Sequence, residues 1–224
     1  MKRLLLTLCL LISTVGVSAQ DFSKERSYVH QIQIQTASGS GVSIADGYLI
    51  TSAHVVLAIP KGSIVIDNYA RARVVKIDPF GDLALLYAPD IHCPCAPLAD
   101  GIPSIDEELV GVGYPLYQLV EVQLATEGRF QGLNKNEQMV TTVDITFGNS
   151  GGGMFTKKDS KLVAIVDSII GIPQGPPNFN ISDMHHYIAI GVSVLKVRSF
   201  IKLPTGQPTV NGLSSLGPEK TMTN

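Results

Sequence analysis

The chain has 224 residues, with 17 basic and 19 acidic side chains and 45% hydrophobic residues. A charge this close to neutral argues against nucleic acid or an anionic membrane surface as the main partner, because both are recognised through strong positive fields. The length suits one all-β unit or two small barrels that can bury a sizeable core without metal or disulfide support.

Residues 1–19 are predicted to be a signal peptide. A basic start precedes an apolar run over residues 4–17, and Val17-Ser18-Ala19 offers the small residues at which a signal peptidase cuts. The run is short for a membrane span of ~20 residues, so we expect cleavage after Ala19 rather than a retained anchor. The mature chain then carries 15 basic and 19 acidic side chains, a net charge of −4. It is expected outside the cytoplasm, periplasmic or secreted, with no stable membrane association.

Short strands dominate the chain from Tyr28 onward. Ile32 and Ile34 alternate with glutamines, which is the period of a half-buried strand, and Asp46-Gly47 is a hairpin-turn pair. Together with this first strand, the pattern predicts a small six-stranded barrel within residues 20–92, its other strands being 41–44, 48–52, 63–67, 70–77 and 83–88.

Residues 93–106 are predicted to connect two domains, because their prolines and glycines cannot continue a sheet ladder. Cys93 and Cys95 lie in this connection, one residue apart. A bond between such close neighbours requires strained geometry, and the local sequence lacks the further ligands of a metal site. Two free or loosely paired thiols are therefore expected.

A second set of six strands is predicted within residues 107–203, at 108–113, 119–130, 138–145, 152–156, 162–169 and 187–192. Ser193 can cap a final helix whose apolar residues fall on one face, namely Val194, Val197, Phe200 and Ile201. Residues 204–224 have too little apolar content for another domain and are expected to be disordered. The predicted fold class is all-β.

Residues 147–153 place Ser150 among four glycines. A serine hydroxyl is a useful nucleophile only when a base takes its proton and nearby amides accept the charge of the tetrahedral intermediate. In the loop of Gly148, Asn149 and Ser150, the N–H groups of Gly148 and Ser150 are the predicted donors of this oxyanion hole. Taken alone, the same letters would equally suit a tight turn.

Two further segments supply the partners that such a serine needs. His54 closes the strand 48–52 and is a candidate general base, although alone it could equally be a core histidine. Asp82 stands immediately before an apolar strand and could accept the His54 ring N–H, which fixes the tautomer of the base. A turn-capping role fits Asp78 better than Asp82.

These segments, in the order His, Asp, Ser, resemble the trypsin-like serine proteases, and most closely the protease domain of the bacterial HtrA/Deg branch. The similarity rests on residues 39–42, 48–56, 81–86 and 148–152, with weaker echoes at 111–115, 126–128 and 188–190, and it covers roughly residues 33–203. Only about twenty residues follow Leu203. The PDZ domain of that branch is therefore not expected, and its trimeric assembly is left open.

The resemblance implies two perpendicular six-stranded antiparallel barrels, with His54 and Asp82 from the first and Ser150 from the second meeting in the cleft between them. It further implies a serine endopeptidase that cleaves unfolded or extended polypeptide through an acyl-enzyme, without a cofactor or metal. Asn149 stands where animal enzymes of the family have an aspartate, so their zymogen switch is not expected.

Two interpretations of substrate specificity stay open. Asp144 precedes Ser150 by six residues, the spacing at which trypsin places the acid that binds Lys or Arg. The pocket of the HtrA/Deg branch is usually apolar, and strand alternation could turn Asp144 away from it. Ile188, Ala189 and Ile190 are expected to form the strand along which an extended substrate pairs, which favours small or aliphatic side chains.

Two other functions remain as alternatives to a general endopeptidase: an inactive binding or scaffold protein with a collapsed oxyanion loop, and a processing enzyme for one partner. The expected partner is a polypeptide, with no nucleic acid, and the oligomeric state is open. The remaining histidines are expected mostly at the surface, namely His30, His92, His185 and His186.

Overall fold

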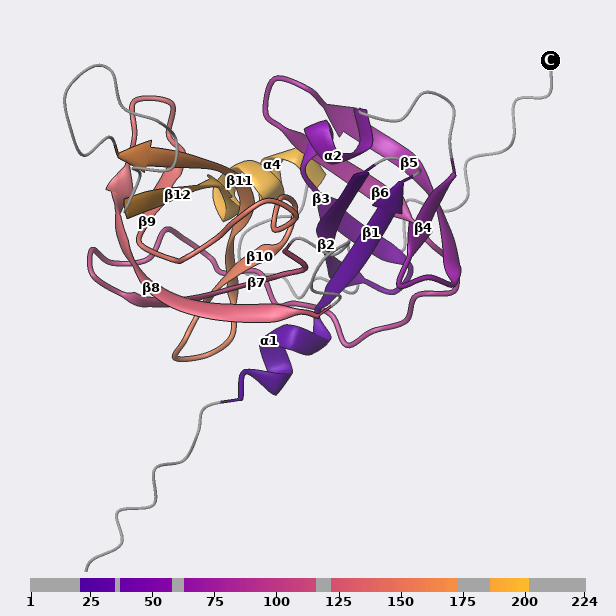
Figure 1. The fold of residues 1–224 in the computed structure, drawn as a ribbon, viewed down its shortest axis with the longest axis horizontal. Coiled ribbons are helices and arrows are strands. Elements are labelled where there is room, and N and C mark those ends of the chain that lie inside the picture. The colour runs from indigo at the N-terminus through magenta and orange to yellow at the C-terminus, as the bar shows by residue number, and fades with distance from the viewer. Residues whose placement is uncertain (1–20, 35–36, 58–62, 116–121, 173–185, 202–224) are drawn as a thin grey trace, which may run out of the picture.

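The computed structural model describes residues 21–34, 37–57, 63–115, 122–172 and 186–201. The predicted signal peptide and the predicted disordered tail lie outside these residues. Within them the chain forms two closed barrels of six antiparallel strands each, and Figure 1 shows them side by side. This confirms the predicted double-barrel, all-β fold.

The first barrel has the strand order β1-β2-β3-β6-β5-β4 and closes where β1 pairs with β4. Apolar side chains fill it, and all four residues of β3 are buried. Its strands are β1 (Val29–Ile34), β2 (Ala37–Ala45), β3 (Tyr48–Thr51), β4 (Ile64–Ile66), β5 (Ala70–Asp78) and β6 (Leu83–Tyr87).

The second barrel has the order β10-β11-β12-β9-β8-β7. Strand β9 is shorter than predicted, because the chain after Thr141 leaves the ladder and crosses Gly128 so closely that a side chain there would overlap the Val143 backbone. The strands are β7 (Glu108–Gly113), β8 (Leu124–Leu133), β9 (Met139–Thr141), β10 (Gly153–Thr156), β11 (Leu162–Ile172) and β12 (His186–Ser193).

The two barrels share one apolar core. The larger cluster of buried side chains contains Ile44, Leu83 and Leu85 of the first barrel together with most of the core of the second. Tyr28, just before β1, places its ring 5.9 Å from that of Phe155 in β10. A smaller cluster fills the rest of the first barrel. Because the core is continuous, the cleft between the barrels has fixed walls.

The described residues contain three helices besides the barrel strands: α1 (Ser23–Ser27), α2 (Ala53–Leu57) and α4 (Val194–Ile201). The predicted apolar face of α4 is buried. The two five-residue helices were not predicted, because they are shorter than the window over which helical periodicity shows. Helix α1 lies against the second barrel, where Ser160 Oγ donates to the buried carboxylate of Glu25 over 2.6 Å. At the other end, Lys76 of β5 donates to the Phe200 carbonyl over 2.6 Å.

The connection between the barrels contains a Cys93–Cys95 disulfide, with Cα atoms 4.7 Å apart. This corrects the expectation of free or loosely paired thiols: the loop backbone brings the two Cα atoms within the usual range for a bond. Further along, Ala99 N–H donates to the Leu162 carbonyl, and the buried Arg198 of α4 donates to the carbonyls of Leu98 and Ala99 at 2.9 Å each.

We expect Arg198→Ala to lower the free energy of unfolding by about 2–4 kcal/mol, since it removes buried charge-assisted hydrogen bonds and leaves two buried carbonyls without their donor. Urea unfolding followed by circular dichroism measures this. Ser199→Ala, an exposed position on the same helix, is the control and should stay within about 0.5 kcal/mol of the wild type. Equal midpoints for the two variants would contradict a structural role for Arg198.

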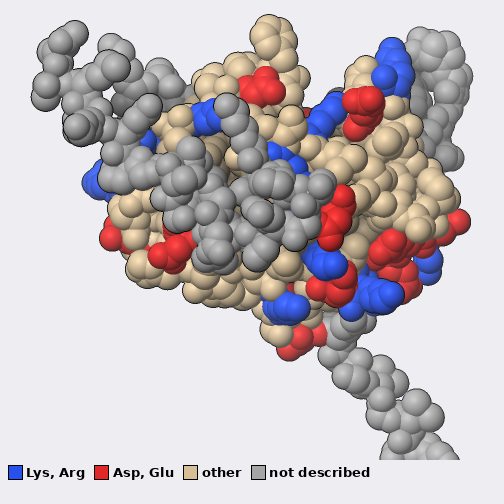
Figure 2. All heavy atoms as spheres, turned by 180° about the vertical axis from the view of Figure 1, so that it is seen from behind, with Lys and Arg blue, Asp and Glu red and all other residues tan. Residues whose placement is uncertain are grey.

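Charged side chains of both signs are mixed over the face seen in Figure 2. Among the described residues, none of the helices is long and apolar enough to span a bilayer.

Candidate active site

A cavity of about 620 Å³ opens between the barrels. The first barrel contributes Ile34, Ser38, His54 and Val55 to its lining, and the second contributes residues 145–148, Ser150 and 166–169. The structure therefore brings His54 and Ser150, which are far apart in the sequence, to one cleft.

His54 lies in helix α2 rather than at the end of a strand. Strand β3 ends at Thr51, and the chain then turns into a short helix whose Val55 and Val56 are buried against the first barrel. This rotation leaves the His54 side chain 49% exposed on the cleft side. The predicted location in the cleft is right, whereas the predicted backbone setting is wrong.

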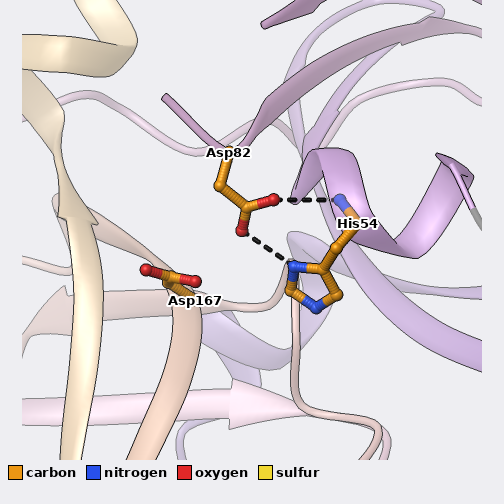
Figure 3. A group of neighbouring side chains, drawn as sticks. All are labelled: His54, Asp82 and Asp167. Atoms are coloured by element: carbon orange, nitrogen blue, oxygen red, sulfur yellow. Dashed lines mark hydrogen bonds and ion pairs between the residues drawn. The ribbon is translucent and has the colours of Figure 1, made fainter. Parts of the chain in front are cut away.

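Asp82 holds His54 by two hydrogen bonds, which Figure 3 shows. His54 N–H donates to Asp82 Oδ1 over 2.9 Å, and Asp82 Oδ2 lies 2.8 Å from Nδ1 of the ring. Asp78 caps the preceding turn by accepting from the Phe80 and Gly81 N–H groups, so the division of roles between the two aspartates is as expected. Both carboxylate oxygens of Asp82 therefore bind His54.

The pKa values of this pair follow from the contact. The hydrogen bond to Asp82 raises the pKa of His54 above its ordinary value, against the opposing effect of burial. Burial opposes ionisation of Asp82, but the hydrogen bonds from His54 outweigh it and hold the pKa of Asp82 below its ordinary value. The pair is therefore a stable carboxylate beside an imidazole of increased basicity.

Ser150 faces the same cavity, but its hydroxyl is not bonded to His54. Among the described residues its Oγ donates only to the Asp167 carbonyl, over 3.4 Å, and His54 Nε2 has no hydrogen-bond partner. Serine side chains occupy staggered rotamers, so the Ser150 hydroxyl can change its hydrogen-bond partner by rotating about χ1 from one rotamer to another. Catalytic hydrogen bonds are often long or absent before substrate binds, so the arrangement does not exclude the nucleophile role.

The loop before Ser150 leaves two amides unengaged. Among the described residues, neither Gly148 N–H nor Ser150 N–H donates a hydrogen bond, whereas Asn149 N–H donates to the Thr146 carbonyl over 3.1 Å. Gly148 has φ 96°, a conformation that favours glycine. Two of the three predicted oxyanion residues thus have a free donor, and the third amide is occupied.

Ser40 of the first barrel fixes this loop from behind. Its N–H donates to the Ser150 carbonyl over 2.8 Å, and its Oγ donates to the Gly148 carbonyl over 2.9 Å. Gly151, with φ 81°, passes so close that a side chain there would overlap the Ser40 carbonyl and Thr51 Oγ1. Gly151 is therefore required by the close approach of the first barrel.

Comparison with known proteins decides the family. Residues 39–165 match the model of the trypsin-like peptidase domain, a stretch that contains His54, Asp82 and Ser150. This chain belongs to the trypsin-like peptidase family. A search of curated proteins found no match.

Solved structures share the fold of this trypsin-like peptidase. A serine endoprotease from Yersinia pestis superposes with a TM-score of 0.63 at 22% identity, over 79% of this chain and 62% of that one. An inactive serine-to-alanine mutant of Rv3671c from M. tuberculosis gives a TM-score of 0.62 at 20% identity, over 83% and 90% of the chains. The chain thus spans less than two thirds of the Yersinia protein, and at these identities the likeness concerns the fold.

The residues predicted to set the specificity of the peptidase do not line the cavity. Asp144 is exposed, and its carbonyl accepts from Thr126 Oγ1, while the neighbouring Ile145 faces the cavity. Ala189 and Ile190 lie in an interior strand, paired with β9 on one side and β11 on the other. Both edges of β12 are occupied at these two residues, while Ile188 pairs with Ile170 of β11. The structure therefore does not support substrate pairing along residues 189–190.

One residue of the site was missed. Asp167 of β11 points toward the His54–Asp82 pair in Figure 3, and donor atoms of the three side chains all lie within 4.8 Å of one another. Gln138 Nε2 donates to Asp167 Oδ2 over 2.6 Å. Burial, together with the Asp82 carboxylate, raises the pKa of Asp167 to about 6. The signal in the sequence is a lone acid within an apolar strand, which rarely occurs without a partner.

Among the described residues, His54, Asp82 and Asp167 form one group whose donor atoms could hold a metal ion. His54 Nδ1 and Asp82 Oδ2 already share a hydrogen bond, so the three side chains form a proton-sharing network.

A second Ser–His–Asp chain lies outside the cleft. Ser43 Oγ lies 2.8 Å from His30 Nε2, and His30 Nδ1 lies 2.6 Å from Asp67 Oδ2. Ser43 is only 1% exposed and lines no cavity among those described. His92 is at the surface as expected, whereas His30 is largely buried. The side chains of His185 and His186 lie outside the description.

Proposed function

We propose that the chain is a serine endopeptidase that hydrolyses peptide bonds of unfolded or extended polypeptides. One observation carries this proposal: a His–Asp pair faces one cavity from the first barrel, and Ser150 faces it from the second, with its own N–H and that of Gly148 unengaged among the described residues. Such a constellation serves acyl transfer. The partner would be a polypeptide, and the mixed charges of Figure 2 together with the slight negative charge give no support to a nucleic-acid partner.

In the proposed mechanism Ser150 Oγ attacks the carbonyl carbon of the scissile bond while His54 Nε2 takes its proton. Asp82 keeps Nδ1 protonated and stabilises the imidazolium. The N–H groups of Gly148 and Ser150 receive the oxyanion. His54 then returns the proton to the leaving amine, which leaves an acyl-enzyme, and the same groups activate the water that hydrolyses it.

The Ser150–Asp167 hydrogen bond favours a second candidate, an inactive binding protein of the same fold. The peptide between Gly148 and Asn149 argues against it. Its carbonyl is held by Ser40 Oγ and its N–H by the Thr146 carbonyl, so the two outer amides stay free for an anion. A loop fixed in this way is prepared for catalysis rather than collapsed.

An extracytoplasmic location, periplasmic or secreted, is part of the proposal. The predicted signal peptide supports it, and so does the Cys93–Cys95 disulfide, because disulfides persist mainly in oxidising compartments.

We expect cleavage after small or aliphatic residues rather than after Lys or Arg. Ile145, Val166 and Ile169 give the cavity an apolar lining, whereas Asp144 lies outside it. The test is digestion of a reduced and alkylated protein by the chain from Gln20 onward, beside Asp144→Asn, with mass spectrometry of every cut site. A fluorophosphonate probe should label Ser150 in the same preparation. Cuts after Lys or Arg that disappear in Asp144→Asn would overturn the apolar pocket, and absence of both cleavage and labelling would favour the binding protein.

A further inference from the structure

Two carboxylates from different barrels meet beside one histidine. Asp82 precedes β6 of the first barrel, Asp167 belongs to β11 of the second, and His54 lies within 4.8 Å of both by its nearest donor atoms. A serine-peptidase mechanism uses one carboxylate in this place. The second is therefore available for another role.

The described surroundings of Asp167 supply no charge besides those of Asp82 and His54. Gln138, which donates to it, is neutral. Strand β10 carries no ionisable side chain, the side chains of residues 188–193 in β12 are uncharged, and Arg198 of α4 is turned to the carbonyls of Leu98 and Ala99. Among the described residues, only Asp82 and His54 act electrostatically on Asp167.

Two carboxylates at this distance cannot both ionise at low cost in a partly buried site. Asp82 keeps its charge because His54 donates two hydrogen bonds to it. Asp167 is therefore the carboxylic acid that resists ionisation, and its pKa of about 6 lies in the range where histidine side chains titrate. The charge of Asp167 thus changes near the pH at which histidine side chains ordinarily titrate.

We propose that Asp167 is a positioning residue that sets the basicity of His54 according to pH. When ionised, it places a second negative charge near the imidazole and stabilises the imidazolium that forms during attack. When protonated, Asp167 is neutral and its O–H donates a hydrogen bond to the Asp82 carboxylate, so the second negative charge is absent. The inference rests on the proposed endopeptidase function of the same site.

The sign of the effect is specific. The negative charge of Asp167 contributes to the raised pKa of His54. In Asp167→Asn the pKa of His54 should therefore be lower. His54 then remains neutral, and able to accept a proton, at more acidic pH than in the wild type. The acid limb of kcat/KM should shift to lower pH, while the plateau at pH 8 falls by about tenfold because the base is weaker. A purely structural defect would lower the plateau without extending activity into acid.

The experiment measures kcat/KM against pH for the wild type, Asp167→Asn and Asp167→Glu, which keeps the charge. Asp46→Asn, an exposed carboxylate paired with His92, controls for a general change in net charge. We expect only Asp167→Asn to move the acid limb to lower pH and to raise several-fold the ratio of activity at pH 5.5 to that at pH 8. An unmoved limb, or the same shift in Asp46→Asn, would overturn the proposal.

An NMR titration of the His54 ring in the same proteins gives a readout that needs no activity. A lower pKa of His54 in Asp167→Asn supports the inference, and an unchanged one overturns it. Failure of the proposed function would show differently, as a wild-type protein that neither cleaves nor reacts with the fluorophosphonate probe, whatever the His54 titration gives. Circular dichroism of each variant excludes unfolding as the cause.

Discussion

Replacing Ser150 by alanine is expected to reduce kcat for peptide hydrolysis by on the order of 10⁴ to 10⁶, because the nucleophile and the proton that His54 accepts are both lost. The fold should be unaffected, since among the described residues the hydroxyl makes a single long hydrogen bond, of 3.4 Å, to the Asp167 carbonyl. The measurement is hydrolysis of an unfolded protein by equal amounts of wild type and variant, with probe labelling at residue 150 as the second readout.

Ser43→Ala is the matched control, because Ser43 also belongs to a Ser–His–Asp chain. It is buried and lines no described cavity, so its loss should leave kcat within about twofold and lower the free energy of unfolding by about 1–3 kcal/mol. If Ser43→Ala abolished cleavage in a folded protein while Ser150→Ala did not, the assignment of the nucleophile would be refuted.

The second large effect is expected from Asp82→Asn, with a loss of about 10⁴ in kcat near neutral pH. The carboxamide cannot accept both hydrogen bonds that Asp82 takes from His54, from the backbone N–H at 2.9 Å and from the ring at 2.8 Å. The imidazole would lose its fixed tautomer and the charge that stabilises its protonated form. Steady-state kinetics at saturating peptide measures the change, since the effect lies in kcat rather than KM.

Asp67→Asn is the counterpart in the buried chain, where Asp67 accepts from the Gln31 N–H and contacts His30. We expect lower stability there but activity close to that of the wild type. Retention of more than about a tenth of the activity by folded Asp82→Asn would show that His54 does not depend on its carboxylate in the expected way.

Much of the fold could be predicted because strands with one buried face leave a period of two in the sequence. Strand β7 lies over the residues expected, and the other strands differ by a few residues at their ends. The differences arise where tertiary contacts override the local pattern. At Gly128, for example, the close crossing of the next segment ends the ladder that β9 would otherwise continue.

The site could be predicted only where its segments carry a recognisable sequence motif. His54 and Ser150 line one cleft as expected, with Asp82 bonded to His54, but the five-residue helix that carries His54 has no periodic signal of its own. Asp167 is visible as an acid in an apolar strand, yet nothing local tells that β11 of one barrel faces the histidine of the other. That information lies in how the barrels dock.

The first and last described helices each contact the barrel to which they do not belong. Glu25 in the first helix is bound by Ser160 of the far barrel, 135 positions away, and Lys76 of the near barrel binds the Phe200 carbonyl across 124 positions. Contacts of such separation close large loops, which makes them late events in folding. A nascent chain therefore cannot lock its first barrel to the second until nearly all residues through the last helix have been synthesised. We expect the cleft to be among the last regions to form, once the residues of the last helix have been synthesised.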